Sequence, residues 1–366
     1  MNANPRRVVM ATAAVSLALV LTACGVAKEA RPRPHHPKKT GPLTIALLLP
    51  ENETARYENF DRPLIRKKIH QLCAECEVLY NNAESDPSVQ QQQVDTMITK
   101  RVDVIVVDAV DSESIASSVR KADEAGIPVV AYDRLALGPV SAYTSFDNEQ
   151  VGRVQGRGLL KALGKKAGTG QIVMLNGWEA DPNAAEFKRG ALSVLKGKVR
   201  IGRSYDVDRW LPDKAHDDMN GAISSLGKDA IIGVYAANDG LAGGAITALR
   251  GGGFDPLPPV TGQDSELAGV QRVLAGTQYM SVFKPYEPEA TAAAEMAVAL
   301  GRGRPVPAQR TVDSATTRGI PATLITPVAL TRDNVKDTVL RDRLYPLGKI
   351  CTPRYRAACE RAGLLP

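Results

Sequence analysis

The chain has 366 residues, which exceeds one ordinary domain, so we expect two. Its composition, 44% hydrophobic and 23% charged, is typical of a globular protein and excludes wholesale disorder and a collagen-like fibre. The formal net charge of +6 comes from the first 40 residues, which hold seven Lys or Arg and one acidic residue. Because the remaining residues are neutral overall, the charge gives no evidence for a nucleic-acid partner, which would require a basic face.

The N-terminus carries the clearest signal. Arg6 and Arg7 precede sixteen mostly apolar residues, 8–23, a stretch short of the ~20 residues of a membrane span but typical of a secretory signal. It ends in Leu-Thr-Ala-Cys-Gly at 21–25, which resembles the bacterial lipobox, where the cysteine is lipidated. We therefore expect residues 1–24 to be a lipoprotein signal peptide, with Cys24 as the lipidated first residue of the mature protein; an ordinary signal peptide with a chance cysteine is the alternative. No later segment is long and apolar enough to predict a spanning helix.

Prolines and basic residues without an apolar pattern fill residues 25–42, which predicts a stiff, extended tether. At ~3.1 Å per residue it would reach about 55 Å. The adjacent His35 and His36 are weak evidence for a metal site on such a strand. Only His70 and His216 lie elsewhere, so we expect no catalytic metal.

Four cysteines remain besides Cys24, and an exported protein can keep them as disulfides. Three pairings are possible. We favour the two local pairs over a redox-active Cys-x-x-Cys or a zinc site, because the first pair lacks the context of a thioredoxin site and nothing in the spacing brings the pairs together. The expected disulfide residues are Cys73, Cys76, Cys351 and Cys359.

Strand and helix patterns alternate after the tether. The apolar run 43–49 suits a parallel strand buried on both faces, and the alternation that follows predicts a doubly wound sheet. We expect helices at 56–71, 87–100 and 112–125 and strands at 77–80, 103–107 and 127–131. The pattern then restarts, with strands at 142–145, 171–175, 199–205, 231–235, 260–261 and 279–283 and helices at 150–163, 183–195, 213–226, 240–250, 266–274 and 287–300. Two such α/β units predict two Rossmann-like lobes with a cleft between them.

Polar residues follow the predicted strands, at the sheet edge where open α/β sheets bind ligands. Asp and Asn at these points, such as Asp147 and Asp239, are also explained as helix N-caps. Arg134 and Lys284 are not, so the set as a whole predicts a binding cleft. Its residue types suit charge-assisted hydrogen bonds to neighbouring hydroxyls, and aromatic side chains in loops are candidates to cover an apolar C–H face. The set comprises Glu51, Asn52, Asn81, Asn82, Asp108, Asp133, Arg134, Asn176, Asn238, Asp239, Gln263, Asp264 and Lys284, with the aromatic candidates Tyr57, Trp178, Phe187 and Trp210.

Motifs of catalysis are missing from the sequence: it has no G-x-S-x-G elbow, no H-E-x-x-H and no Walker A. The glycine-rich stretch 152–158 lacks the order of a dinucleotide-binding loop and falls in a predicted helix, so close packing explains it better than phosphate binding. We expect no enzymatic activity and no cofactor.

Several motifs together resemble the periplasmic-binding-protein-like family of sugar ABC transporters, most closely its D-xylose-binding members. They extend from residue 43 to about 340. The clearest are Val-Ile-Val-Val-Asp at 104–108, Val-Val-Ala-Tyr-Asp-Arg at 129–134, Ser-Phe-Asp-Asn-Glu at 145–149, Ala-Asn-Asp-Gly-Leu-Ala-Gly-Gly at 237–244, Gly-Gln-Asp at 262–264 and Val-Phe-Lys-Pro at 282–285.

The resemblance implies a type I periplasmic binding protein, a Venus flytrap of two Rossmann-like lobes joined by a three-strand hinge. The implied boundaries are 43–141 plus about 285–316 for the N-terminal lobe and 142–284 plus about 317–344 for the C-terminal lobe. Residues 345–366, with two cysteines, look like an added cap. Tyr57 stands where the family has a tryptophan, which leaves the sugar's identity open. The implied ligand-binding residues are Arg56, Tyr57, Asp133, Arg134, Asn183, Phe187, Trp210, Asn238, Asp264 and Lys284.

The function implied by the resemblance is capture of a monosaccharide, with D-xylose favoured, by the solute-binding subunit of an ABC importer. This subunit would be a monomer that is lipid-anchored to the outer face of the cell membrane. It would deliver the sugar to an ABC permease, and its second partner, through the permease, would be the cytoplasmic ATPase. A sugar sensor that feeds a signalling receptor is one alternative, and an exported sugar-acting enzyme is a weaker one. A LacI-like repressor shares the fold but needs a DNA-binding headpiece, whereas residues 1–42 form a signal and tether.

Overall fold

The computed structural model describes residues 39–366. The predicted signal peptide, Cys24, the histidine pair and most of the tether lie outside the described residues. The described residues all belong to one unit of the chain, His35–Pro366. None of the helices in this part of the chain is long and apolar enough to cross a membrane.

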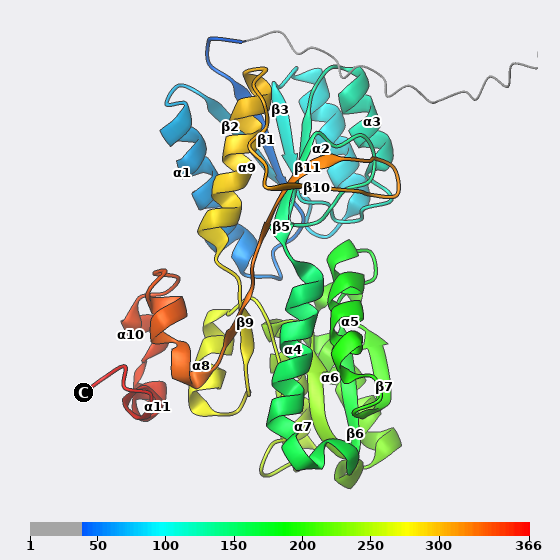
Figure 1. The fold of residues 1–366 in the computed structure, drawn as a ribbon, viewed down its shortest axis with the longest axis vertical. Coiled ribbons are helices and arrows are strands. Elements are labelled where there is room, and N and C mark those ends of the chain that lie inside the picture. The colour runs from blue at the N-terminus through cyan, green and yellow to red at the C-terminus, as the bar shows by residue number, and fades with distance from the viewer. Residues whose placement is uncertain (1–38) are drawn as a thin grey trace, which may run out of the picture. The chain divides into compact units, whose positions relative to one another are not determined.

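A seven-stranded sheet forms the first lobe, in the order β10-β11-β5-β4-β3-β1-β2 (Figure 1). All neighbours are parallel except β10, which runs antiparallel to β11. The strands are β1 (Thr44–Leu49), β2 (Glu77–Asn82), β3 (Val104–Val107), β4 (Val129–Tyr132), β5 (Ala142–Phe146), β10 (Arg310–Val312) and β11 (Ile320–Ile325). The helices are α1 (Arg62–Leu72), α2 (Pro87–Thr99), α3 (Ala116–Glu124) and α9 (Tyr286–Gly301).

Strand β1 shows why this sheet is covered on both faces. Its odd-numbered residues, Ile45, Leu47 and Leu49, pack with α1 and α9, whereas Ala46 and Leu48 pack with α2 and α3. Successive side chains of a strand point to opposite faces, so a continuous apolar run needs a helix layer on each side. The buried strand predicted at 43–49 is thereby confirmed.

The second lobe contains a smaller parallel sheet in the order β7-β6-β8. A bridge between Val234 and Val260 extends this sheet. The segment around Val260 in turn hydrogen-bonds to the backbone just before and within β9. Strand β9 pairs antiparallel with β12. The strands are β6 (Gln171–Asn176), β7 (Arg200–Asp206), β8 (Ile231–Ala236), β9 (Ser281–Phe283) and β12 (Val328–Leu330). The helices are α4 (Asn148–Leu163), α5 (Pro182–Leu195), α6 (Pro212–Leu226), α7 (Asp239–Gly251) and α8 (Leu267–Ala275).

Three chain segments connect the lobes: β5 to α4, β9 to α9, and β11 to β12 (Figure 1). The structure differs here from the boundaries expected from sequence. The residues of β5 and β11 were assigned to the second lobe but lie in the first sheet, where Tyr143 of β5 is paired with Ala131 on one side and Ala322 on the other. The chain therefore changes lobe after these strands end, not where they begin.

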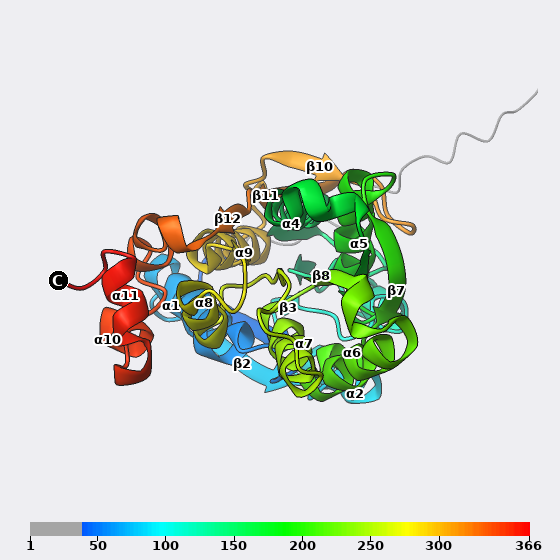
Figure 2. The same cartoon turned by 90° about the horizontal axis from the view of Figure 1, so that it is seen from below.

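The C-terminal segment packs on α8 of the second lobe (Figure 2). It contains the short helices α10 (Leu347–Ile350) and α11 (Arg356–Arg361), and Ile350 and Cys359 join Val270 and Leu274 of α8 in one apolar cluster. Disulfides link Cys351 to Cys359 in this segment and Cys73 to Cys76 after α1. The structure thus contains both of the local pairs expected from the sequence.

Candidate functional site

A small pocket between the lobes is lined by all ten residues that the sequence analysis selected. Arg56 and Tyr57 lie between β1 and α1, and Asp133 and Arg134 follow β4. The other six come from the second lobe or its border: from α5, from the residues after β7, β8 and β9, and from the residues after the segment that bridges β8 at Val260. The pocket also includes Thr54, Asp181 and Gln263. Its members thus come mostly from the carboxyl ends of strands, as expected for an open α/β sheet.

Arg134, from the first lobe, is surrounded by three carboxylates. Its guanidinium lies 2.9 Å from Asp181, 3.5 Å from Glu51 and 3.7 Å from Asp108, and it also donates to the Tyr57 hydroxyl at 3.2 Å. Burial by itself disfavours the charged form, but the carboxylates, Asp181 foremost, outweigh it and raise the pKa of Arg134 well above its usual value. This arginine is therefore a fixed, permanently charged fork.

Arg56 is held in the same way by other carboxylates. Its guanidinium pairs with Asp61 at 2.7 Å, with Asp133 at 3.3 Å and with Glu289. Tyr132 adds a hydroxyl that accepts from Arg56 and donates to Asp61. Burial opposes the charge, yet Asp133, Asp61 and Glu289 raise the pKa of Arg56 well above its usual value. Since Asp61 and Glu289 do not line the pocket, they act by positioning the arginine.

The second lobe supplies a cation, a carboxylate and two aromatic rings. Lys284 lies 3.0 Å from Asp264, and its Nζ is 4.9 Å from the centre of the Phe187 ring. Phe187 and Trp210 meet edge to face at 6.4 Å, and the indole N–H of Trp210 donates to Asp181 at 3.2 Å. These contacts fix the flat face of Trp210 at the wall of the pocket.

Local backbone geometry explains how these rings reach the pocket. A Cβ on Gly177 would lie 2.0 Å from the Trp210 ring, so only glycine leaves room for the indole. A Cβ on Gly152 would similarly lie 2.0 Å from the carbonyl oxygen of Phe187. The glycine-rich stretch 152–158 therefore serves close packing of α4 on α5, as the sequence analysis expected.

Three residues of the site hold a left-handed backbone conformation. Asp133 has φ 53°, Trp210 has φ 58° and Asp264 has φ 83°. Such conformations are costly for residues other than glycine and persist where the surrounding structure fixes them, often at ligand sites. The three side chains are thus aimed by their backbones as well as by their partners.

Tyr57 adds a hydroxyl to the first-lobe side of the pocket. It donates to Asp133 Oδ2 at 3.1 Å and accepts from Arg134 at 3.2 Å. Burial raises the pKa of Tyr57 well above its usual value, so the hydroxyl stays protonated and can keep donating. Tyr57 therefore ties Asp133 and Arg134 into one rigid group.

The lobes are in contact across the pocket. Asn183 of the second lobe donates to the carbonyl oxygen of Asp133 in the first at 3.2 Å, beside the Arg134–Asp181 pair. All ten selected residues are at most 5% exposed, and the cavity that they leave is about 20 Å³, the scale of one water molecule. A larger ligand can enter only if the lobes separate.

Four buried polar atoms of the pocket make no hydrogen bond within the described residues. They are Gln263 Oε1 and three atoms that are ion-paired: Arg56 Nη1, 3.3 Å from Asp133; Arg134 Nε, 2.9 Å from Asp181; and Asp264 Oδ1, 3.0 Å from Lys284. The ion pairs compensate the three charged groups in part, whereas an unsatisfied buried amide oxygen costs about 1–3 kcal/mol. A ligand that carries several hydroxyls could bond to all four atoms, because a hydroxyl both donates and accepts.

Asp181 lines the pocket but was not predicted from the sequence. Asp181 accepts from the backbone N–H of Asn183 and precedes Pro182, so in sequence it looks like an ordinary helix N-cap. Asp61 and Glu289 were missed because each lies in a helical stretch, and only the fold shows that they face Arg56. Thr54 carried no signal. Gln263 was noted after its strand but was not selected.

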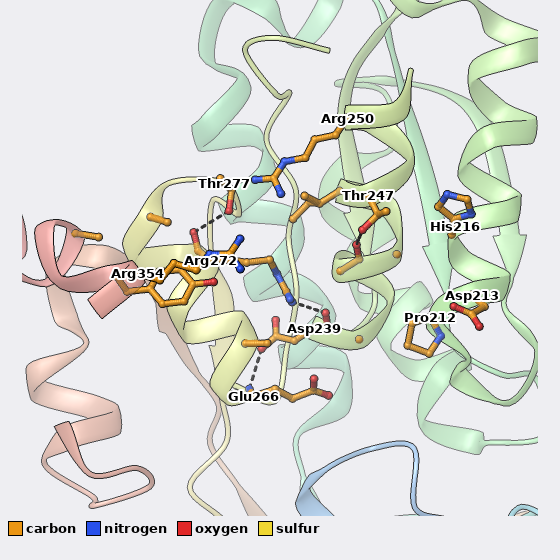
Figure 3. Close-up of a pocket in the computed structure, with 18 of the residues that line it drawn as sticks. Pro212, Asp213, His216, Asp239, Thr247, Arg250, Glu266, Arg272, Thr277 and Arg354 are labelled. Atoms are coloured by element: carbon orange, nitrogen blue, oxygen red, sulfur yellow. Dashed lines mark hydrogen bonds between the residues drawn. The ribbon is translucent and has the colours of Figure 1, made fainter. Parts of the chain in front are cut away.

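A second cavity, between α6, α7, α8 and the C-terminal segment, contains none of the ten residues (Figure 3). The carboxylate of Asp239 lies at its base and accepts from Gln278, Ser281 and the backbone N–H of Glu266. Asn238, not Asp239, caps α7. Burial raises the pKa of Asp239 to about 7. This carboxylate ties the start of α7 to β9 and α8.

Metal binding finds no support in residues 39–366, where no three His, Cys, Asp or Glu side chains are grouped to hold an ion. The candidate pair His35 and His36 lies outside them.

Two lobes with crossing strands and a ligand pocket at their interface define a two-lobed solute-binding protein. Residues 45–305 match the family model described as periplasmic binding protein domain, and the chain belongs to that family. It is 36% identical over 309 residues to the D-xylose-binding periplasmic protein of Escherichia coli K12, covering 83% of this chain and 91% of that protein. The D-xylose-binding periplasmic protein of Haemophilus influenzae is 33% identical, with 83% and 90% covered.

Among solved structures, the chain is similar to an ABC transporter solute binding protein from Clostridium phytofermentans with bound β-D-glucose. The TM-score is 0.78 at 27% identity, and the match covers 84% of this chain and 99% of that one. The type I periplasmic binding protein fold expected from the sequence is confirmed.

Proposed function

We propose that this protein is the extracytoplasmic solute-binding subunit of an ABC importer and that it captures a monosaccharide, D-xylose in first place. The observation that carries the proposal is one buried interlobe pocket that brings together the charged groups of Arg56, Arg134, Asp264 and Lys284 and the rings of Phe187 and Trp210. The names of the two similar D-xylose-binding proteins support the choice of sugar.

The pocket chemistry fits a pyranose. Arg134 presents a rigid fork that can hold two neighbouring oxygens, and Asp264 and Asn238 can bind further hydroxyls. Trp210 and Phe187 offer apolar faces for the C–H side of the ring. Arg56 is held by Asp61 and Glu289 of its own lobe, and Lys284 by Asp264 of the second, so these groups lose little side-chain freedom on binding.

Capture follows from the two-lobe arrangement. Arg56 and Arg134 belong to the first lobe, and Trp210 and Asn238 to the second, so a sugar contacts both sets only when the lobes are together. A ligand shifts an equilibrium by its differential affinity for the two states, and the sugar therefore stabilises the closed form. The closed form would then deliver the sugar to a permease that works with a cytoplasmic ATPase.

Anchoring belongs to the same proposal. A lipidated Cys24 would hold the protein at the outer face of the cell membrane, as a monomer on its proline-rich tether. The similar proteins are solute-binding proteins rather than enzymes, so an exported sugar-acting enzyme is the weaker alternative. A sensor role, in which the closed form binds a signalling receptor, would use the same pocket.

D-Glucose is the second candidate ligand. Tyr57 replaces the family's tryptophan at the pocket wall, and the similar solved structure holds β-D-glucose. A thermal-shift screen of the mature protein against D-xylose, D-glucose, D-ribose and L-arabinose distinguishes the candidates. We expect the largest increase in melting temperature with D-xylose. A larger shift with D-glucose would assign the protein to a hexose.

A further inference from the structure

A separate groove lies at the border of the two lobes, beside the pocket. It has a volume of about 800 Å³ and shares Asn183 with the pocket. Resting on the proposed function, we propose that this outer groove is a second sugar subsite. The protein then binds a neutral disaccharide, with one ring in the pocket and the other in the groove.

Both lobes build the groove, as they build the pocket. Leu135, Leu137 and Tyr143 come from the first lobe, and Trp178 and Pro182 come from the loop that leads into α5. That same loop carries Asp181, which pairs with Arg134 inside the pocket. One loop thus faces both spaces, so closing the lobes forms the pocket and the groove together.

Asn183 lines both the pocket and the groove and so lies between them. On the pocket side, the amide of Asn183 bonds to Asp133 at 3.2 and 3.4 Å, both toward the long end for hydrogen bonds. Tyr143, a groove residue, donates to the same carbonyl oxygen of Asp133 at 3.1 Å. A glycosidic oxygen beside Asn183 can accept from its amide N–H in place of these two long bonds, while the amide oxygen of Asn183 keeps accepting from Asn148 at 2.9 Å.

The groove offers what a sugar ring needs. Trp178 is half-buried against the apolar core of the second lobe, and the bond from the Asp181 N–H to its carbonyl oxygen holds it in a turn. Trp178 was selected from the sequence as a possible stacking residue, yet it does not line the pocket. The groove is also lined by four carboxylates that can accept hydrogen bonds from sugar hydroxyls: Asp111, Glu113, Glu179 and Glu186.

Charge restricts the second ring to a neutral sugar. Four carboxylates line the groove, and within the part of the chain that the structure describes no Lys or Arg side chain lines it. A uronic acid placed there would face like charges at short range, which is unfavourable. The groove therefore disfavours disaccharides whose second ring is acidic. The pocket binds the first ring equally well in acidic and neutral disaccharides.

Calorimetry with wild type and two variants tests this inference. The ligands are D-xylose, β-1,4-xylobiose and a glucuronic acid–xylose disaccharide. We expect xylobiose to bind wild type, and Trp178→Ala to weaken xylobiose at least tenfold while changing D-xylose affinity less than twofold. Glu113→Lys should strengthen the acidic disaccharide, whereas Glu124→Lys, an exposed carboxylate outside the groove, should not.

Each outcome distinguishes this inference from the proposed function. Binding of D-xylose without binding of xylobiose overturns the second subsite and leaves the proposed function standing. Equal loss of both ligands in Trp178→Ala, or no loss of either, also overturns it. If no sugar binds wild type at all, the proposed function itself is wrong.

Discussion

The guanidinium of Arg134, from the first lobe, lies 2.9 Å from the carboxylate of Asp181, from the second. Asp181 also accepts from the indole of Trp210 and caps α5. One carboxylate therefore joins the arginine fork, the aromatic wall and the contact between the lobes. The geometry of the pocket depends on closure for this reason.

Removal of either main anchor should weaken sugar binding. We expect Arg134→Ala and Trp210→Ala each to cost about 2 kcal/mol or more in calorimetric titration, within the range of anchors at buried interfaces. Arg134→Lys should recover little, because an ammonium lacks the fork geometry. Trp210→Phe should recover part, since it keeps a flat ring.

Arg120→Ala is the matched control, because Arg120 is exposed on α3 and lines none of the cavities described above. It should bind as wild type does. Undiminished affinity in both anchor variants, with normal unfolding curves, would place the ligand elsewhere.

Asp181→Asn tests the pair across the cleft. Asparagine still caps α5 and still accepts from Trp210, but it removes the charge that faces Arg134. We expect sugar affinity to fall about tenfold and the ligand-free protein to show a larger radius of gyration in X-ray scattering, because the closed state loses an ion pair. Asp208→Asn, at an exposed carboxylate of the same lobe, should change neither. Wild-type affinity in Asp181→Asn would show that this ion pair has no role in closure.

Asp239 should make stability depend on pH. Burial raises its pKa to about 7, and an unfolded aspartate titrates near 4, so between these values the folded state holds a proton that the unfolded state has lost. The free energy of unfolding should therefore fall by roughly 1 kcal/mol per pH unit from about pH 4 to 7, and the effect should level off above pH 7.

Asp239→Asn removes that titration. The free energy of unfolding of wild type and variant is measured with urea at pH 5, 6, 7 and 8. The wild-type value minus the variant value should fall by roughly 1 kcal/mol per pH unit up to pH 7. Parallel profiles would mean that Asp239 is ionised throughout, stabilised by Gln278, Ser281 and the nearby Arg272.

Cys24→Ser should release the protein from the membrane. Stable anchoring needs two acyl signals, which a diacylated cysteine supplies. Fractionation of cells that express wild type and variant measures this. A variant that remains in the membrane fraction as wild type does would contradict the lipobox interpretation.

Periodicity predicted the elements well, because apolar runs and alternating patterns report burial directly. The strand at 171–175 and the helix at 183–195 agree with β6 and α5 to within a residue. Strands β10, β11 and β12 were not predicted; β10 and β12 have three residues each, are largely exposed and have little pattern. The predicted helix 56–71 is divided into a turn at Tyr57–Asp61 and α1.

The pocket residues could be selected because they follow strands and match a family's motifs. The residues that hold these pocket side chains in place could not be predicted in this way. Glu289 stands 233 positions after Arg56, and only the packing of α9 beside β4 and β5 brings the two together. In sequence Asp181 looks like an ordinary capping residue, because its contacts with Arg134 and Trp210 form only in the folded protein. Sequence patterns report local burial, whereas such pairs depend on the tertiary fold.

A calorimetric titration of D-xylose into the mature protein tests the central claim most directly. A pentose has ten heavy atoms, so a ceiling of ~1.5 kcal/mol per atom allows about −15 kcal/mol, and micromolar binding requires only about −8. We predict one site with micromolar or tighter affinity. Absence of heat with D-xylose, D-glucose, D-ribose and L-arabinose, from protein that unfolds cooperatively, would contradict the sugar assignment.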